Sequence, residues 1–172
     1  MRILDVGCGR KKVPGSIGLD LCVVVAPDVV CDLNRTPYPF ASSTFDKIVL
    51  NKVIEHLPDV VLVMNELHRI GKPGCDVLIK TPHFSSLYSW QDPTHRHHLA
   101  YDSFDYFTEA TKHSNFYTGC RYEMVEKNIQ FGKSFLALVP WLLFRLSKHK
   151  YEKHFAFMFP ANDLTFHLKV VK

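Results

Sequence analysis

The sequence lacks the features of membrane-spanning, disulfide-stabilised and secreted proteins. Its five cysteines are odd in number and scattered, with no Cys-x-x-Cys spacing. This argues against a disulfide or zinc framework and for a reducing cytoplasm. The longest strongly apolar run, Phe135–Phe144, is too short to span a bilayer and contains Pro140. Core sequence follows Arg2 at once, so we expect no signal peptide and a cytoplasmic protein.

Strong charge and repetition are also missing. The net charge of +4 is mild, and no long basic stripe occurs, so we expect no nucleic-acid partner. Internal repeats and low-complexity tracts are absent. With 47% apolar and 22% charged residues among 172, the composition predicts a single globular domain over residues 1–172.

The most informative stretch is Leu4–Asp20. A short apolar run ends in a Gly7-x-Gly9 turn, and a second run, Ile17–Leu19, ends in Asp20. Strand, glycine turn, strand and terminal acid is how an open α/β sheet forms a nucleotide crevice at its carboxyl edge. The glycines let the backbone turn sharply and approach a ligand closely.

The details of this turn disfavour dinucleotides and ATP. A dinucleotide fingerprint requires a third glycine where this chain has Lys12, and its acid comes much later than Asp20. The Gly-Lys-Ser/Thr of a Walker loop is absent. Acids before and soon after the turn suit a ligand with cationic and hydroxyl groups instead of a pyrophosphate.

The rest of the chain alternates short strands with helices, which predicts a parallel sheet. The clearest helix has apolar residues at helical spacing over 60–70 and ends at Gly71. Further strands are predicted at Val29–Leu33, Phe45–Leu50 and Cys75–Thr81, with a late antiparallel pair at Glu123–Phe131 and Leu164–Val171. The fold class is α/β: a Rossmann-like open sheet, mostly parallel, with an antiparallel C-terminal strand.

Three segments interrupt this regular pattern. His83–Tyr101 is aromatic and histidine-rich without a sustained period, which predicts a long functional loop. Ser103–Lys112 is predicted to be a helix capped by Ser103. An apolar helical insertion is predicted around 134–159.

The order of these motifs resembles the class I S-adenosylmethionine (SAM)-dependent methyltransferases, of the type 11-like methyltransferase domains. Their first motif is acid-x-Gly-x-Gly, here Asp5 to Gly9, and the phrases Val53–Leu57 (VIEHL) and Gly71–Gly74 (GKPG) are similar too. The resemblance implies SAM as cofactor and methyl transfer to an unidentified acceptor, expected to be a small molecule. A methyltransferase-shaped binding or scaffold protein without activity is the alternative, and an NAD-binding oxidoreductase is disfavoured by Lys12.

The resemblance also implies a set of cofactor contacts. Asp5 would lie near the methionine ammonium, Asp20 would accept the ribose hydroxyls, and Asp32 would accept the adenine amine. Taken singly, each acid is more often just an exposed residue at a strand end. For Asn51, a helix N-cap is nearly as good an interpretation. The expected cofactor-binding residues are Asp5, Gly7, Cys8, Gly9, Asp20, Leu21, Asp32, Leu33 and Asn51.

Two departures from the family shorten the site. Only Arg10–Ser16 separates the glycine turn from the second strand, too few residues for a stable helix. The sequence also starts at the first strand, so we expect the N-terminal helix of the family to be missing. The cofactor pocket should therefore be more open, which makes SAM affinity the property to measure.

On the acceptor side, His83 or His95 is the candidate general base, because histidine titrates near neutrality. A loop whose polar residues only hold one another in place is the alternative, since methyl transfer mainly needs alignment. We expect no metal site: Glu55 and His56 lack a suitably spaced partner. The histidines near Asp92 are crowded and match no familiar ligand pattern.

The apolar helix over residues 135–146 is followed by Lys148, Lys150 and Lys153. Its apolar residues run all round the helix, which favours a homodimer interface or a lid over the cofactor side. Peripheral contact with a membrane surface is the less favoured interpretation.

Overall fold

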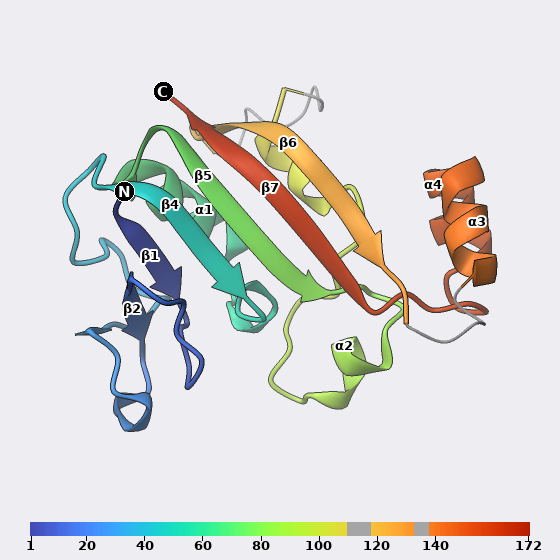
Figure 1. The fold of residues 1–172 in the computed structure, drawn as a ribbon, viewed down its shortest axis with the longest axis horizontal. Helices are drawn as coiled ribbons and strands as arrows, with labels where there is room; N and C mark the ends of the chain where they lie inside the picture. The colour runs from blue at the N-terminus through green and yellow to red at the C-terminus, as the bar shows by residue number, and fades with distance from the viewer. Residues whose placement is uncertain (110–117, 133–137) are drawn as a thin grey trace.

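The computed structural model describes residues 1–109, 118–132 and 138–172, and its strands form one seven-stranded sheet in the order β3-β2-β1-β4-β5-β7-β6 (Figure 1). Neighbours from β3 through to β5 pair in parallel, whereas β7 runs antiparallel to both β5 and β6. The predicted fold class is confirmed. The strands are β1 Ile3–Val6, β2 Ser16–Asp20, β3 Val29–Val30, β4 Phe45–Asn51, β5 Gly71–Pro82, β6 Arg121–Gln130 and β7 Asp163–Val171.

Two strand boundaries differ from those predicted by three residues or more. β3 stops at Val30 because Asp32 begins a turn, in which the Arg35 amide donates to its carbonyl at 3.0 Å. β5 starts at Gly71, four residues before the predicted Cys75. The pairing of β4 with β5 shifts register between Phe45 and Lys47, and the extra residues lie in β5, which lets this early segment pair.

The helix α1, Val60–Ile70, forms as predicted because its apolar residues lie on one face. It buries Val63, Met64, Leu67 and Ile70, and the Asp59 side chain accepts from the Leu62 amide at 2.8 Å to cap its start. Gly71 follows it directly and begins β5. α1 therefore packs behind the central strands and leads the chain back to the edge where β5 starts (Figure 1).

The structure differs from the prediction in the histidine-rich loop and in the helix that follows it. A short helix α2, Leu87–Gln91, lies inside the segment predicted as loop, started by the Ser86 hydroxyl. Ser103–Phe107 forms a 3-10 helix, η3, whose N-cap is Asp102; Ser103 instead accepts from the Ala100 amide. The predicted helical residues 110–112 lie outside the described part of the chain.

The apolar insertion between β6 and β7 contains α3, Leu138–Leu146, then α4, Lys148–Lys150, and a π-helical turn η6, Tyr151–Phe155. The expected residues 134–137 lie outside the described range. α3 buries Phe144 but leaves Leu138, Leu142 and Leu146 exposed. The homodimer through this helix stays a prediction. Among the described helices, none has the length and apolar character needed to cross a membrane.

The two faces of the sheet are covered unequally. α1 and η3 lie on the face that buries Ile48, Ile79 and Phe166 (Figure 1). Over the described residues, no helix crosses the opposite face of β4, β5 and β7, where Val49 and Leu78 are half-buried. Arg10–Ser16 contains no helix, as its length predicted.

Candidate functional site

The glycine turn after β1 requires both of its glycines. Gly7 and Gly9 have φ angles of +65° and +50°, the left-handed region that side chains disfavour. The Gly7 and Cys8 amides donate to the Leu19 carbonyl at 2.7 and 3.2 Å, which ties the turn to β2. A Cβ on Gly7 would lie 2.4 Å from a methyl of Val53, whereas a Cβ on Gly9 would meet no atom of the described residues within 4 Å. The turn therefore has no space for a side chain at Gly7 but has free space beside Gly9.

Two acids hold this turn through the backbone. Asp5 is buried, and its Oδ2 accepts from the Val13 amide at 2.7 Å. Burial raises the pKa of Asp5, which the Val13 hydrogen bond partly opposes. Asp20 accepts from the Gly9 amide at 2.9 Å with one oxygen and from the Cys22 amide at 2.9 Å with the other. Since each carboxylate oxygen has two lone pairs, Asp20 retains acceptor capacity for a ligand.

The third acid, Asp32, lies in the turn after β3. Its Oδ1 accepts from the backbone and side-chain nitrogens of Asn34 at 3.0 and 2.8 Å, and its Oδ2 lies 3.4 Å from Arg35 Nε. The neighbouring Leu33 is buried, and its carbonyl accepts from the Tyr38 hydroxyl at 2.9 Å. The turn therefore presents a carboxylate and an apolar side chain at fixed positions.

These segments enclose a cavity of about 250 Å³, which we call the cofactor cavity. Five of the residues expected to bind cofactor line it: Gly7, Asp20, Leu21, Asp32 and Leu33. The remaining lining residues are Asn34, Lys52, Val53, His56 and Leu57. Asp5 and Gly9 shape the turn without lining the cavity, and Cys8 is buried. Asn51 is exposed and lines a separate groove on the open face of the sheet.

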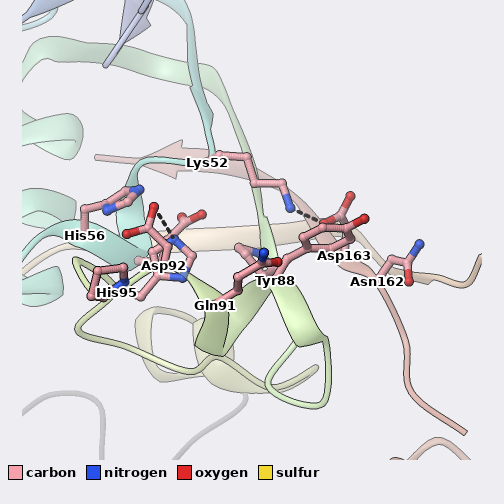
Figure 2. Close-up of a pocket in the computed structure, with 11 residues that line it drawn as sticks. Lys52, His56, Tyr88, Gln91, Asp92, His95, Asn162 and Asp163 are labelled. Atoms are coloured by element: carbon pink, nitrogen blue, oxygen red, sulfur yellow. Dashed lines mark hydrogen bonds and ion pairs between the residues drawn. The ribbon is translucent and has the colours of Figure 1, made fainter.

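A larger cavity of about 730 Å³ adjoins the first, and we call it the acceptor cavity. Lys52 and His56 line both cavities, so the two meet at the end of β4. In Figure 2, Lys52 points toward Asp163 at one side, while His56, Asp92 and His95 gather at the other. The described lining is completed by Glu55, Pro82, Tyr88, Gln91, Pro93 and Asn162.

Lys52 lies at the junction in an unusual backbone conformation. Its φ is +60°, uncommon for a residue with a side chain, and its amide donates to the Lys80 carbonyl at 2.8 Å. Its ammonium pairs with Asp163, whose second oxygen lies 3.2 Å from Lys80 Nζ. Strained backbone often marks functional sites. The left-handed turn places this lysine where the two cavities meet, with its ammonium directed toward Asp163 in the acceptor cavity (Figure 2).

Glu55 connects the segment after β4 to the histidine-rich loop. It is buried, and its Oε2 accepts from the Thr81 hydroxyl at 3.1 Å. Its carbonyl accepts from the amides of Arg96 and His97 at 2.8 and 3.2 Å, which brings the loop against the cavity. Burial raises the pKa of Glu55, and the Thr81 hydrogen bond and the nearby His56 oppose that rise.

The two histidines of the acceptor cavity are held by hydrogen bonds at Nδ1. His56 Nδ1 lies 2.8 Å from Thr94 Oγ1, and His95 Nδ1 lies 3.0 Å from the Ser89 carbonyl. Their rings pack edge to face with centroids 4.6 Å apart. Asp92 Oδ2 lies 4.0 Å from His95 Nε2. Hydrogen bonds from Thr94 lower the pKa of Asp92, so this carboxylate stays ionised beside the histidines.

The structure separates the two candidate bases of the sequence. His95 lines the acceptor cavity, whereas His83 is fully buried and lies outside the described lining. The His83 ring contacts Ser85 Oγ at 2.8 Å through Nδ1 and Glu152 Oε1 at 3.0 Å through Nε2. Glu152 also accepts from the Tyr101 amide at 2.7 Å. His83 thus connects the loop to the apolar insertion.

Several residues of the site were missed at the sequence level. Lys52 and Asp163 form a pair across 111 positions, and no local pattern signals such a contact. Asp28 accepts from the Gly18 amide at 2.6 Å and from Lys12 Nζ at 2.7 Å, which lowers its pKa. Lys12, which distinguished this turn from a dinucleotide site, therefore has a structural partner. The φ of Lys52 has no signature in the sequence either.

Comparison with known proteins agrees with this geometry. Residues 1–125 match a family model described as a methyltransferase domain, which covers more than half of the chain. The chain therefore belongs to the methyltransferase domain family, and the predicted class I, SAM-dependent methyltransferase assignment is confirmed. SAM is the cofactor of this class, as expected from the sequence. No curated protein matches the chain in sequence.

Solved structures share the fold at low identity. A SAM-dependent methyltransferase from Archaeoglobus fulgidus is 19% identical, with a TM-score of 0.61 over 98% of this chain and 85% of that one. One from Mesorhizobium loti is 14% identical, with a TM-score of 0.62 over 98% and 90%. Phosphoethanolamine N-methyltransferase 2 from Haemonchus contortus, solved with SAM, is 16% identical, with a TM-score of 0.60 over 99% and 48%.

Proposed function

We propose that this chain transfers the methyl group of SAM to a small-molecule acceptor bound in the acceptor cavity. The observation that carries the proposal is that the cofactor and acceptor cavities share Lys52 and His56. Methyl transfer depends mainly on holding donor and acceptor in line, and adjoining cavities are suited to this. The acceptor cavity, at about 730 Å³, is in the size range of small-molecule sites.

The residues of the cofactor cavity fit SAM in chemistry. Asp20 keeps free lone pairs for hydroxyl donors, and Asp32 presents a second carboxylate in the same cavity. The open space beside Gly9 allows close approach to the backbone. When bound, SAM supplies an electrophilic methyl group on a sulfonium. The role of the chain is to orient that group toward the shared wall of the two cavities.

The acceptor cavity combines apolar and ionisable groups. Pro82, Pro93 and Tyr88 offer apolar surface, while His95 offers a ring nitrogen, Nε2, as a proton acceptor. This arrangement suits an acceptor with an apolar body and an oxygen or nitrogen nucleophile. Of the two predicted bases, His95 is the one whose position in the acceptor cavity supports a role as general base. His83 serves to hold the loop.

The test is binding of S-adenosylhomocysteine, the product form of the cofactor, by calorimetry. We expect binding by the wild type and a loss of at least about tenfold in Asp20→Ala, because one charge-assisted contact is worth about 1.5–3 kcal/mol. Asp76→Asn is the matched control. Asp76 pairs with His167 on the open face of the sheet, away from both cavities, so binding should stay unchanged.

A second measurement separates transfer from binding. Wild-type protein with SAM and fractionated small molecules should release S-adenosylhomocysteine, whereas Asp20→Ala should release less at limiting SAM. If the folded wild type gives no heat with millimolar S-adenosylhomocysteine, the proposal fails. A binding or scaffold role would then be the better account.

A further inference from the structure

One end of the acceptor cavity contains a cluster of metal-ligating side chains. Glu55, His56 and His95 each place one ligand atom within 4.8 Å of the other two. Glu55 and His56 belong to η2, Ile54–His56, directly after β4. His95 arrives from the histidine-rich loop because Arg96 and its neighbour donate to the Glu55 carbonyl. All three line the cavity wall.

Glu55 has a carboxylate oxygen that finds no partner in the described part of the chain. The residue is 1% exposed, and Oε2 is occupied by the Thr81 hydroxyl. Oε1 is buried and has no hydrogen-bond partner among the described residues. A buried carboxylate oxygen without a donor is costly, and such orphans in native proteins call for a bound water or ion. A cation beside the two histidines would satisfy it.

The hydrogen bonds of the histidines leave their outer nitrogens free to bind a metal. Thr94 Oγ1 donates to Asp92 Oδ1 at 2.7 Å, so it accepts from His56 Nδ1. The Ser89 carbonyl can only accept, so it fixes the proton of His95 on Nδ1. Each Nε2 then carries an available lone pair. Histidine ligands commonly donate the other ring nitrogen to a carbonyl or a carboxylate-linked group.

We propose that Glu55, His56 and His95 bind a divalent transition-metal ion of the zinc type at this end of the acceptor cavity. Two imidazoles and one carboxylate are a ligand set of zinc sites that keep a position open. Tetrahedral zinc with bonds of about 2.1 Å spaces its ligand atoms about 3.4 Å apart. Binding would draw the three ligand atoms together from their present separations of up to 4.8 Å. The charge of Asp92, 4.0 Å from His95 Nε2, adds attraction for a cation.

The position of the ion suggests what it does there. Its open coordination position faces the acceptor cavity, because all three ligands line that cavity. An acceptor with an oxygen donor, such as a hydroxyl or carboxylate, would complete the coordination. With the ion bound, the Nε2 lone pair of His95 is used for coordination, so the ion would replace His95 as the group that promotes loss of the acceptor's proton. This part rests on the proposed function, whereas metal binding itself does not.

The experiment uses the full chain, stripped of metal with a chelator and titrated with Zn²⁺ against a competing indicator. We expect one ion per chain at the site, and losses of at least about a hundredfold in affinity for Glu55→Gln and for His95→Ala. Substitution with Co²⁺ should give visible absorption that both variants lose. His149→Ala is the matched control: its side chain is 83% exposed and lies outside the cluster, so binding should be unchanged.

Parallel measurements identify which idea fails. Glu55→Gln keeps the shape of the side chain and removes a buried charge, so the metal-free variant should unfold no earlier than the wild type. If Glu55→Gln and wild type bind Zn²⁺ equally, the metal site is refuted. If the wild type binds S-adenosylhomocysteine but does not bind Zn²⁺, the metal site alone is refuted. Intact, site-dependent zinc binding without S-adenosylhomocysteine binding would refute the proposed function alone.

Discussion

Gly7→Ala should destabilise the protein by about 3 kcal/mol and abolish measurable cofactor binding. The new Cβ would lie 2.4 and 2.8 Å from the two methyl carbons of Val53, a stiff, buried side chain. Overpacking of this kind costs about 1–3 kcal/mol. The left-handed backbone at φ +65° adds about 1–2 kcal/mol for a residue with a side chain. Urea unfolding of the metal-free protein measures the sum.

The neighbouring glycine provides the control. Gly9 has a φ of +50°, but a Cβ there would have no atom within 4 Å among the residues that the structure describes. Gly9→Ala should therefore lower the free energy of unfolding only by the cost of the left-handed backbone, about 1–2 kcal/mol. Equal destabilisation by the two substitutions would contradict the steric argument. It would leave backbone strain as the sole reason for both glycines.

A double-mutant cycle tests the contact with Val53 directly. In a Val53→Ala background the two methyl carbons are gone, so Gly7→Ala should cost only about 1–2 kcal/mol there. The coupling between the two positions should thus be favourable and about 1–2 kcal/mol. S-adenosylhomocysteine affinity should recover in the double variant relative to Gly7→Ala, because the turn regains its shape. A coupling near zero would show that Val53 moves away freely.

The strand-turn-strand fold around Gly7 and Gly9 could be predicted because its signals are local. Gly7, Gly9 and Asp20 lie within one strand-turn-strand segment, and strand pairing puts the end of each parallel strand at the same edge. The shortness of Arg10–Ser16 was enough to predict that this segment forms no helix. The contact of Asp5 with the methionine ammonium stays a prediction, and in the structure its carboxylate accepts from the Val13 amide at the turn.

The acceptor side could not be predicted in the same way, because its contacts join distant segments. Glu55 meets His95 across the loop, and Lys52 meets Asp163 at the start of β7. Histidine spacing within the loop predicted no metal site, because Glu55, a residue of the proposed site, lies outside the loop in η2. His83 and His95 look alike in sequence. Only packing buries one and places the other in a cavity.

Glu66→Ala should cost about 3 kcal/mol, because Glu66 joins α1 to the turn that carries Leu33. Its buried carboxylate accepts from the Tyr38 amide at 2.8 Å and from Arg69 Nε and Nη2, each at 2.8 Å. Removal leaves a buried amide without an acceptor and a half-buried guanidinium without its anion. Tyr38 in turn donates to the Leu33 carbonyl, so cofactor affinity should fall as well.

The controls for Glu66 separate the network from the loss of a charge. Glu123→Ala removes an exposed carboxylate from β6 and should change the free energy of unfolding by less than about 0.5 kcal/mol. Glu66→Gln combined with Arg69→Met should be less destabilised than the sum of the single variants, because the two side chains interact directly. Strict additivity would contradict the ion pair.

The same ion pair predicts how stability depends on pH. Hydrogen bonding to Arg69 holds the pKa of Glu66 below its ordinary value of 4.5. A carboxyl whose pKa is lowered by folding stabilises the protein above the unfolded pKa and loses that contribution as the pH falls through the folded pKa. The stability difference between wild type and Glu66→Gln should therefore be constant from pH 7 to about pH 5, and shrink below pH 4.5. A difference that persists unchanged at pH 3 would show that shape, and not the charge of Glu66, holds the turn.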